Sequence, residues 1–146
     1  MAQRAQGVVL DEFLVSSATI LFDSRASHSF ISSSFVEKHN IPTVLLKLPL
    51  VTRTPGADIH CQLGCSIVRI NLSGVEFLVD LVVLKSKGID VILGMDWLSL
   101  HDGHIGCADK VVYLTSSEGV HVTCHTKGTK SDPMVLVWKT RPWKKF

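Results

Sequence analysis

The sequence contains no apolar run close to the roughly 18 residues that a membrane-spanning helix needs. No apolar stretch of signal-peptide length follows Arg4 either. The net charge is only +2 with the histidines neutral, which is too small by itself to indicate a nucleic-acid partner. We therefore expect an intracellular, cytoplasmic protein that makes no contact with membranes.

Paired Cys-x-x-Cys knuckles are also missing. The four cysteines are Cys61, Cys65, Cys107 and Cys124. In an intracellular chain of this size we expect reduced thiols rather than a disulfide framework. Histidines and cysteines lie close together at 101–107 and 121–125, but zinc sites usually show tighter pairs. We predict no metal site and no cofactor.

Short apolar runs are the main feature that is present. The chain is 46% hydrophobic and 19% charged, and its valines, isoleucines and leucines favour strands. We predict strands at 44–54, 59–72, 75–84, 89–93, 105–107 and 111–114, with a tight turn at Pro55-Gly56. Short helices are expected within 29–40, where Ser34 and Glu37 could form a capping box, and at 95–101. The predicted class is all-β.

Two stretches carry the chemistry. Residues 20–27 form an apolar strand that ends in an acidic turn at Asp23. Burying an unpaired carboxylate is costly, so Asp23 is either a capped turn residue or a working acid, and in isolation the turn is the commoner case. Residues 89–98 form a second buried strand, which passes through Gly94 into a short helix.

Together these stretches resemble the retropepsins, the aspartic proteases of retroviruses and long-terminal-repeat retrotransposons. That family carries two motifs. Asp-Ser/Thr-Gly-Ala follows one strand, and two apolar residues followed by a glycine precede its helix. The matching residues here are Asp23-Ser24-Arg25-Ala26 and Ile92-Leu93-Gly94. The segments 21–24, 27–31 and 90–98 are most similar to gypsy-type retrotransposon proteases of plants. The resemblance covers about residues 18–112, and two such blocks at this spacing are a specific signal.

The resemblance implies a closed retropepsin-like barrel with one short C-terminal helix and another short helix after the catalytic loop. It implies that Asp23 is catalytic, supported by Ser24, Arg25 and Ala26. It also implies a flap, the arm that closes over bound peptide, formed around Thr54, Pro55, Gly56 and Ala57; a plain exposed hairpin is the alternative. The implied substrate is a peptide or a retroelement polyprotein.

The chemistry requires a second carboxylate, because a lone one is a poor catalyst of peptide hydrolysis. Two carboxylates held close together share one proton, an arrangement for which aspartic proteases are the standard example. The chain has one Asp-Ser-x-Ala and no repeat of it, so an active enzyme would be a symmetric homodimer with one Asp23 from each subunit. Asp90 and Asp96 are interpreted as structural, the latter in the first turn of a helix.

Arg25 departs from the family pattern, which has glycine at this position. A side chain here is costly if φ is positive, and a guanidinium adds bulk and a positive charge beside the proposed dyad. We therefore predict weak or absent proteolysis. The alternative function is a catalytically inactive module that dimerises or binds an extended peptide by strand addition.

The two ends of the chain are predicted to lie outside the main domain, which we place at residues 18–114. Residues 1–17 are interpreted as an N-terminal segment that forms a dimer-interface strand or an ordinary edge strand. Residues 115–146 are interpreted as a basic, linker-like extension, because lysines and arginines dominate after Lys127. Tryptophans among these cations leave nucleic-acid binding as a less favoured alternative.

Overall fold

The computed structural model describes residues 2–10, 15–54, 56–86, 88–106, 108, 111–125, 127–129 and 132–137. Two short helices occur in this part of the chain, α1 (Ser33–His39) and α2 (Met95–Leu100). The first six strands are β1 (Ala2–Leu10), β2 (Val15–Asp23), β3 (Phe30–Ser32), β4 (Val44–Thr54), β5 (Ala57–Leu72) and β6 (Val75–Leu84). The others are β7 (Val91–Leu93), β8 (His104–Gly106), β9 (Val111–Thr115), β10 (His121–His125), β11 (Lys127–Thr129) and β12 (Asp132–Val137). The predicted all-β class and both predicted helices are confirmed.

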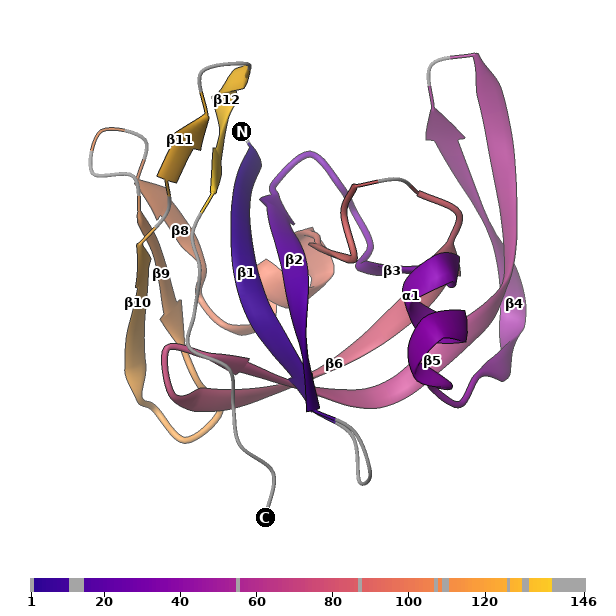
Figure 1. Ribbon diagram of the computed structural model, residues 1–146, viewed down its shortest axis with the longest axis horizontal. Coiled ribbons are helices and arrows are strands. Elements are labelled where there is room, and N and C mark those ends of the chain that lie inside the picture. The colour runs from indigo at the N-terminus through magenta and orange to yellow at the C-terminus, as the bar shows by residue number, and fades with distance from the viewer. Residues whose placement is uncertain are drawn as a thin grey trace.

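The strands form two sheets rather than the predicted closed barrel. The larger sheet has the order β11-β12-β1-β2-β7-β3-β6-β5-β4, and the smaller has the order β10-β9-β8. An additional pairing of β1 with β5 curls the larger sheet back on itself. β4 and β11 remain as its outer strands, so the sheet as a whole does not close. Figure 1 shows the β4–β5 hairpin standing apart at one side of the molecule, with β8, β9 and β10 at the other.

Helix α1 begins one residue before the predicted capping box. Its N-cap is Ser32, which makes no side-chain hydrogen bond to the backbone of the first turn. The Ser34–Glu37 capping box is therefore wrong, because Ser34 already lies inside the helix. The Ser32 hydroxyl is instead 2.7 Å from the Ser34 hydroxyl. The helix ends at His39, and its C-cap is Asn40, a residue type that tolerates the left-handed conformation found there (φ 52°).

The hydrophobic core joins the two sheets through α2. Trp97 lies between Phe22 and Phe77, with ring centroids 6.4 and 5.4 Å away. Val122 and Cys124 of β10 belong to the same core cluster. The core therefore includes side chains from β10, which follows the boundary predicted at residue 114.

The cysteines of the described residues are buried free thiols, as the sequence predicts. Cys61, Cys65 and Cys124 are each at most 3% exposed. Burial raises the pKa of Cys65 to about 11 and that of Cys124 to about 12, because a thiolate is poorly solvated in the core. These thiols are therefore unreactive at neutral pH. Cys107 lies outside the described residues.

His101 is a buried histidine at the end of α2. It is 6% exposed and packs in a tilted arrangement against Trp97 and edge-on against Phe77, with ring centroids 4.6 and 5.0 Å away. Its Nδ1 donates to the Thr115 carbonyl at 3.3 Å, while Nε2 has no partner among the described residues. Burial lowers the pKa of His101 below 6.5, because the imidazolium would lose its hydration.

Acid should therefore destabilise this fold through His101. Below about pH 6.5 the imidazole is protonated more readily in the unfolded chain than in the folded one. The free energy of unfolding therefore falls as the pH falls, by up to about 1.4 kcal/mol per pH unit. We expect His101→Phe to flatten this dependence in urea titrations between pH 7 and pH 5. The exposed His125→Gln variant is the matched control. An unchanged slope in His101→Phe would contradict the assignment.

Candidate active site

Asp23 is the last residue of β2, where the chain leaves the sheet. β2 pairs in parallel with β7, so that Phe22 lies opposite Leu93. The Asp23 carbonyl accepts a hydrogen bond from the backbone N–H of Ala26 at 3.2 Å, and carboxylate Oδ1 accepts one from the N–H of Arg25 at 2.9 Å. Asp23 thus caps its own turn. Its side chain is 17% exposed and lines a cavity, so this role leaves it accessible for chemistry.

Arg25 lies beside the carboxylate without backbone strain. The residues other than glycine that have positive φ in the described part of the chain are Asn40, Ile67, Ser73 and Asp102. Arg25 is not among them, so the condition under which its Cβ would be costly is not met. The guanidinium Nε is 3.4 Å from Asp23 Oδ1, and the arginine side chain is 74% exposed. An ion pair this exposed is weak.

The Asp23 turn rests on the segment that precedes α2. The N–H of Met95 donates to the Ala26 carbonyl at 2.7 Å. A Cβ added to Gly94 would lie 2.3 Å from the His28 carbonyl oxygen and 2.7 Å from that of Ala26. The φ of Gly94 is −95°, so this position requires a glycine for space and not for conformational freedom.

A buried serine connects the same two segments, and sequence reasoning missed it. The Ser29 hydroxyl accepts the Gly94 N–H at 3.0 Å and donates to Asp96 Oδ1 at 2.7 Å. Ser29 is 1% exposed. Asp96 Oδ1 also accepts the backbone N–H of Trp97 at 2.7 Å. Asp96 therefore positions the start of α2, while Asp90 Oδ2 accepts the backbone N–H of Thr19 at 2.7 Å.

A cavity of about 660 Å³ lies between the Asp23 turn and the β4–β5 hairpin. Its lining comprises Asp23, Arg25, Ala26, Ser27, His28, Phe30, Leu50, Val51, Thr52, Arg53, Leu84 and Ile92. The hairpin thus lines the cavity with residues 50–53 of β4, which the sequence did not indicate as site residues. Of the four predicted flap residues, Thr54 ends β4, Gly56 turns with φ 95° and Ala57 begins β5, while Pro55 lies outside the described residues.

The other predicted site residues are distributed around this cavity. Ile92 lines it, whereas Leu93 is fully buried and Gly94 supports the turn. Ser24 is exposed and takes part in a further polar contact. The described residues contain no group of three or more His, Cys, Asp or Glu side chains placed to hold a metal. Neither described helix is long and apolar enough to cross a membrane.

The close approach at Gly94 yields a test of the site scaffold. We expect Gly94→Ala to lower the free energy of unfolding by about 3 kcal/mol or more, because the new methyl group meets two backbone carbonyls that cannot rotate away. In Gly106→Ala the added Cβ meets nothing nearer than 3.4 Å, which makes this variant the matched control. Urea denaturation measures both. Equal losses in the two variants would contradict the argument.

Comparisons with known proteins agree with this arrangement. A search of curated proteins finds no match. The retroviral protease-like domain of Ddi1 from Leishmania major has a similar structure, with a TM-score of 0.55 over 82% of this chain and 92% of that one. The two are 16% identical, so this likeness establishes the retropepsin-like fold alone. A family model described as retroviral aspartyl protease matches residues 1–120. The chain therefore belongs to the retroviral aspartyl protease family.

Proposed function

We propose that this chain is one subunit of a homodimeric aspartic endopeptidase, derived from a gypsy-type retrotransposon, that cleaves peptide or polyprotein segments weakly. The observation that supports this most directly is the position of Asp23. It lies at the end of a strand, in a cavity that faces the arm of a hairpin. The family match supplies the reaction class.

The proposed dimer follows from the number of carboxylates. Among the described residues that line the cavity, Asp23 carries the only carboxylate. Asp90 and Asp96 are held by backbone hydrogen bonds and do not line it. A second Asp23 from a symmetry-related subunit would complete the pair. One carboxylate would then act as base toward a water molecule, while the protonated one polarises the scissile carbonyl.

Arg25 is the proposed cause of weak activity. Its backbone N–H and its Nε both lie near Asp23 Oδ1, at 2.9 and 3.4 Å. A guanidinium in this place competes with the catalytic water and with the proton that the pair must share. Because φ at this residue is not positive, we attribute the effect to the side chain and not to the backbone.

Side-chain truncation tests this proposal. We expect Arg25→Ala and Arg25→Gly to cleave a peptide library at pH 5 at least tenfold faster than wild type, and to about equal extents. Asp23→Asn should cleave nothing. Circular dichroism at pH 5 would check that each variant is folded. Wild-type cleavage as fast as that of Arg25→Ala would overturn the role of Arg25, and cleavage that persists in Asp23→Asn would overturn the role of Asp23.

The second candidate function is that of a catalytically inactive module that binds an extended peptide. The Asp23–Arg25 contact favours it, and β4 is an outer strand of the sheet to which an extended peptide could add. Peptide binding without cleavage in wild type, Arg25→Ala and Arg25→Gly would support this inactive binding module. Sedimentation analysis of the three proteins would show whether the dimer forms.

The cavity lining also indicates a class of peptide. Phe30, Leu50 and Val51 supply apolar surface, while Arg25 and Arg53 supply positive charge. The only described counter-ion of Arg53 is Asp58, at 4.0 Å in an exposed pair, so its charge remains available to a ligand. We propose that apolar side chains next to Asp or Glu are preferred.

Charge reversal at Arg53 tests this preference. In an Arg25→Ala background, we expect Arg53→Glu to lower cleavage of Glu-containing peptides relative to Lys-containing ones by about tenfold, because one attractive contact becomes repulsive. Arg69→Glu, on β5 and outside the cavity lining, is the control. An unchanged Glu-to-Lys ratio in Arg53→Glu would contradict the proposed preference.

A further inference from the structure

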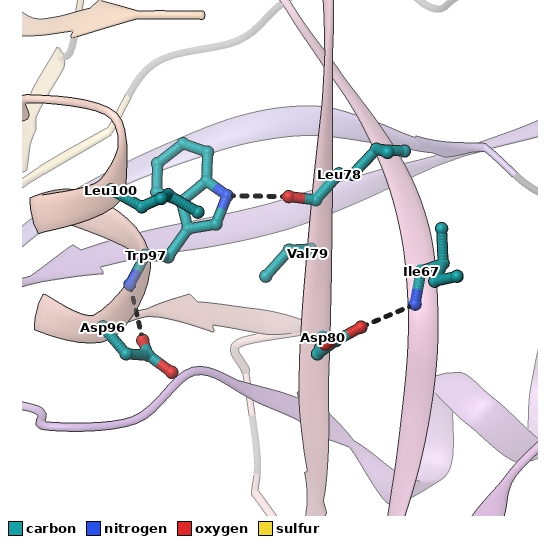
Figure 2. A pocket seen from close by; sticks show the side chains of 7 residues that line it. All are labelled: Ile67, Leu78, Val79, Asp80, Asp96, Trp97 and Leu100. Atoms are coloured by element: carbon teal, nitrogen blue, oxygen red, sulfur yellow. Dashed lines mark hydrogen bonds between the residues drawn. The ribbon is translucent and has the colours of Figure 1, made fainter. Parts of the chain in front are cut away.

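A second cavity, of about 390 Å³, lies between α2 and the β5–β6 pair. It is lined by Ile67, Leu78, Val79, Asp80, Asp96, Trp97 and Leu100 (Figure 2). None of these residues lines the cavity at Asp23. The second cavity is therefore separate from the proposed catalytic site and has no role in the chemistry proposed above.

Exposed apolar side chains surround this second cavity. Ile67 is 69% exposed, Leu78 50% and Leu100 74%. The buried Trp97 ring also lines the cavity, and its Nε1–H donates to the Leu78 carbonyl at 3.2 Å (Figure 2). The indole therefore presents only apolar surface here. Apolar side chains grouped around a cavity in this way mark binding surfaces more often than singly exposed ones do.

The backbone of Ile67 is strained. Its φ is 55°, which is unusual for any residue with a Cβ and particularly for a β-branched one. The residue lies in a bulge between Cys65 and Val68, where the pairing of β5 with β6 changes register. The Ile67 N–H donates to Asp80 Oδ1 at 2.8 Å, as Figure 2 shows. Glycine would adopt this conformation easily, so an exposed isoleucine here is not explained by folding.

The charged residues that line this cavity are all negative. Asp80 and Asp96 line it, and its described lining contains no lysine, arginine or histidine. Oδ1 of each carboxylate accepts a backbone N–H, from Ile67 and Trp97 respectively, so both acids are fixed in place. Both residues are exposed. A cationic group is the complementary partner for two carboxylates held beside an apolar surface.

We propose that this cavity binds a peptide segment in which a bulky apolar side chain lies next to lysine or arginine. The apolar side chain packs among Ile67, Leu78 and Leu100, over Trp97. The neighbouring cation lies against the carboxylates of Asp80 and Asp96. Because the two cavities share no lining residues, the test of this proposal requires neither Asp23 nor cleavage.

A pair of synthetic peptides tests the proposal. The probes are acetyl-Gly-Lys-Trp-Lys-Gly-amide and its Glu-Trp-Glu counterpart. They are titrated into the ¹⁵N-labelled full chain carrying Asp23→Asn, a substitution that we expect to prevent cleavage. We expect saturable shifts of the Ile67 and Asp80 amides and of the Trp97 indole N–H. The Kd of the glutamate peptide should be at least fivefold higher. Asp80→Asn keeps an oxygen acceptor for the Ile67 N–H and should raise the Kd of the lysine peptide at least threefold, whereas Glu118→Gln should not.

A second variant separates binding from folding. Ile67→Gly removes the apolar side chain and relieves the strained φ, so we expect the thermal midpoint to stay the same or rise while peptide binding weakens. Any of three results would overturn the proposal: no saturable shift, equal affinity for the two peptides, or shifts that cluster away from α2 and β6. Concentration-dependent shifts of the same amides without peptide would also overturn it, since a second copy of the chain would then cover the cavity.

Discussion

The close approach between the segment 26–29 and the start of α2 is the constraint on which the rest of the candidate site depends. Gly94 leaves no room for a methyl group beside the carbonyls of Ala26 and His28. Ser29 and the N–H of Met95 hold this contact with hydrogen bonds of 2.7 to 3.0 Å. These contacts fix the position of the Asp23 turn. The carboxylate itself accepts the backbone N–H of Arg25 and lies beside the exposed guanidinium of the same residue.

The aromatic cluster at α2 contains a histidine, so its stability depends on pH. Trp97 and His101 form one aromatic cluster with Phe77, and the lowered pKa of His101 makes this cluster sensitive to protonation. A shared-proton carboxylate pair operates best in mild acid, the range in which His101 begins to oppose folding. The pH range of any activity is therefore expected to be limited by the scaffold on its acid side.

The two segments of the candidate site could be predicted from the sequence, whereas one strand of the core could not. In isolation the apolar strand before Asp23 indicated only a turn, and it was the resemblance of this stretch together with Ile92-Leu93-Gly94 to the retropepsins that pointed to both segments of the candidate site. β10 was missed even though Val122 and Cys124 alternate with polar residues as a strand requires. This stretch lies in the region that the sequence analysis interprets as an extension outside the main domain.

Other features could not be predicted because they depend on tertiary contacts. The prediction for Arg25 was conditional on φ, which only the folded backbone reveals. The roles of residues 50–53 and of Ser29 arise from segments that are distant in sequence. The same holds for Ile67, since nothing in its sequence neighbourhood predicts a bulge whose N–H is held by Asp80.

Asp96 connects the support of the Asp23 turn with the cavity beside α2, although it lines only that cavity. Its Oδ1 accepts the Ser29 hydroxyl, which in turn accepts the Gly94 N–H behind the Asp23 turn. Its carboxylate also lies in the lining of the cavity beside α2. A cation bound there would attract the charge of Asp96 and so compete with the hydrogen bond from Ser29. Because Ser29 is buried and its hydroxyl also accepts the Gly94 N–H, this serine is held in place, and we expect the two cavities to act independently.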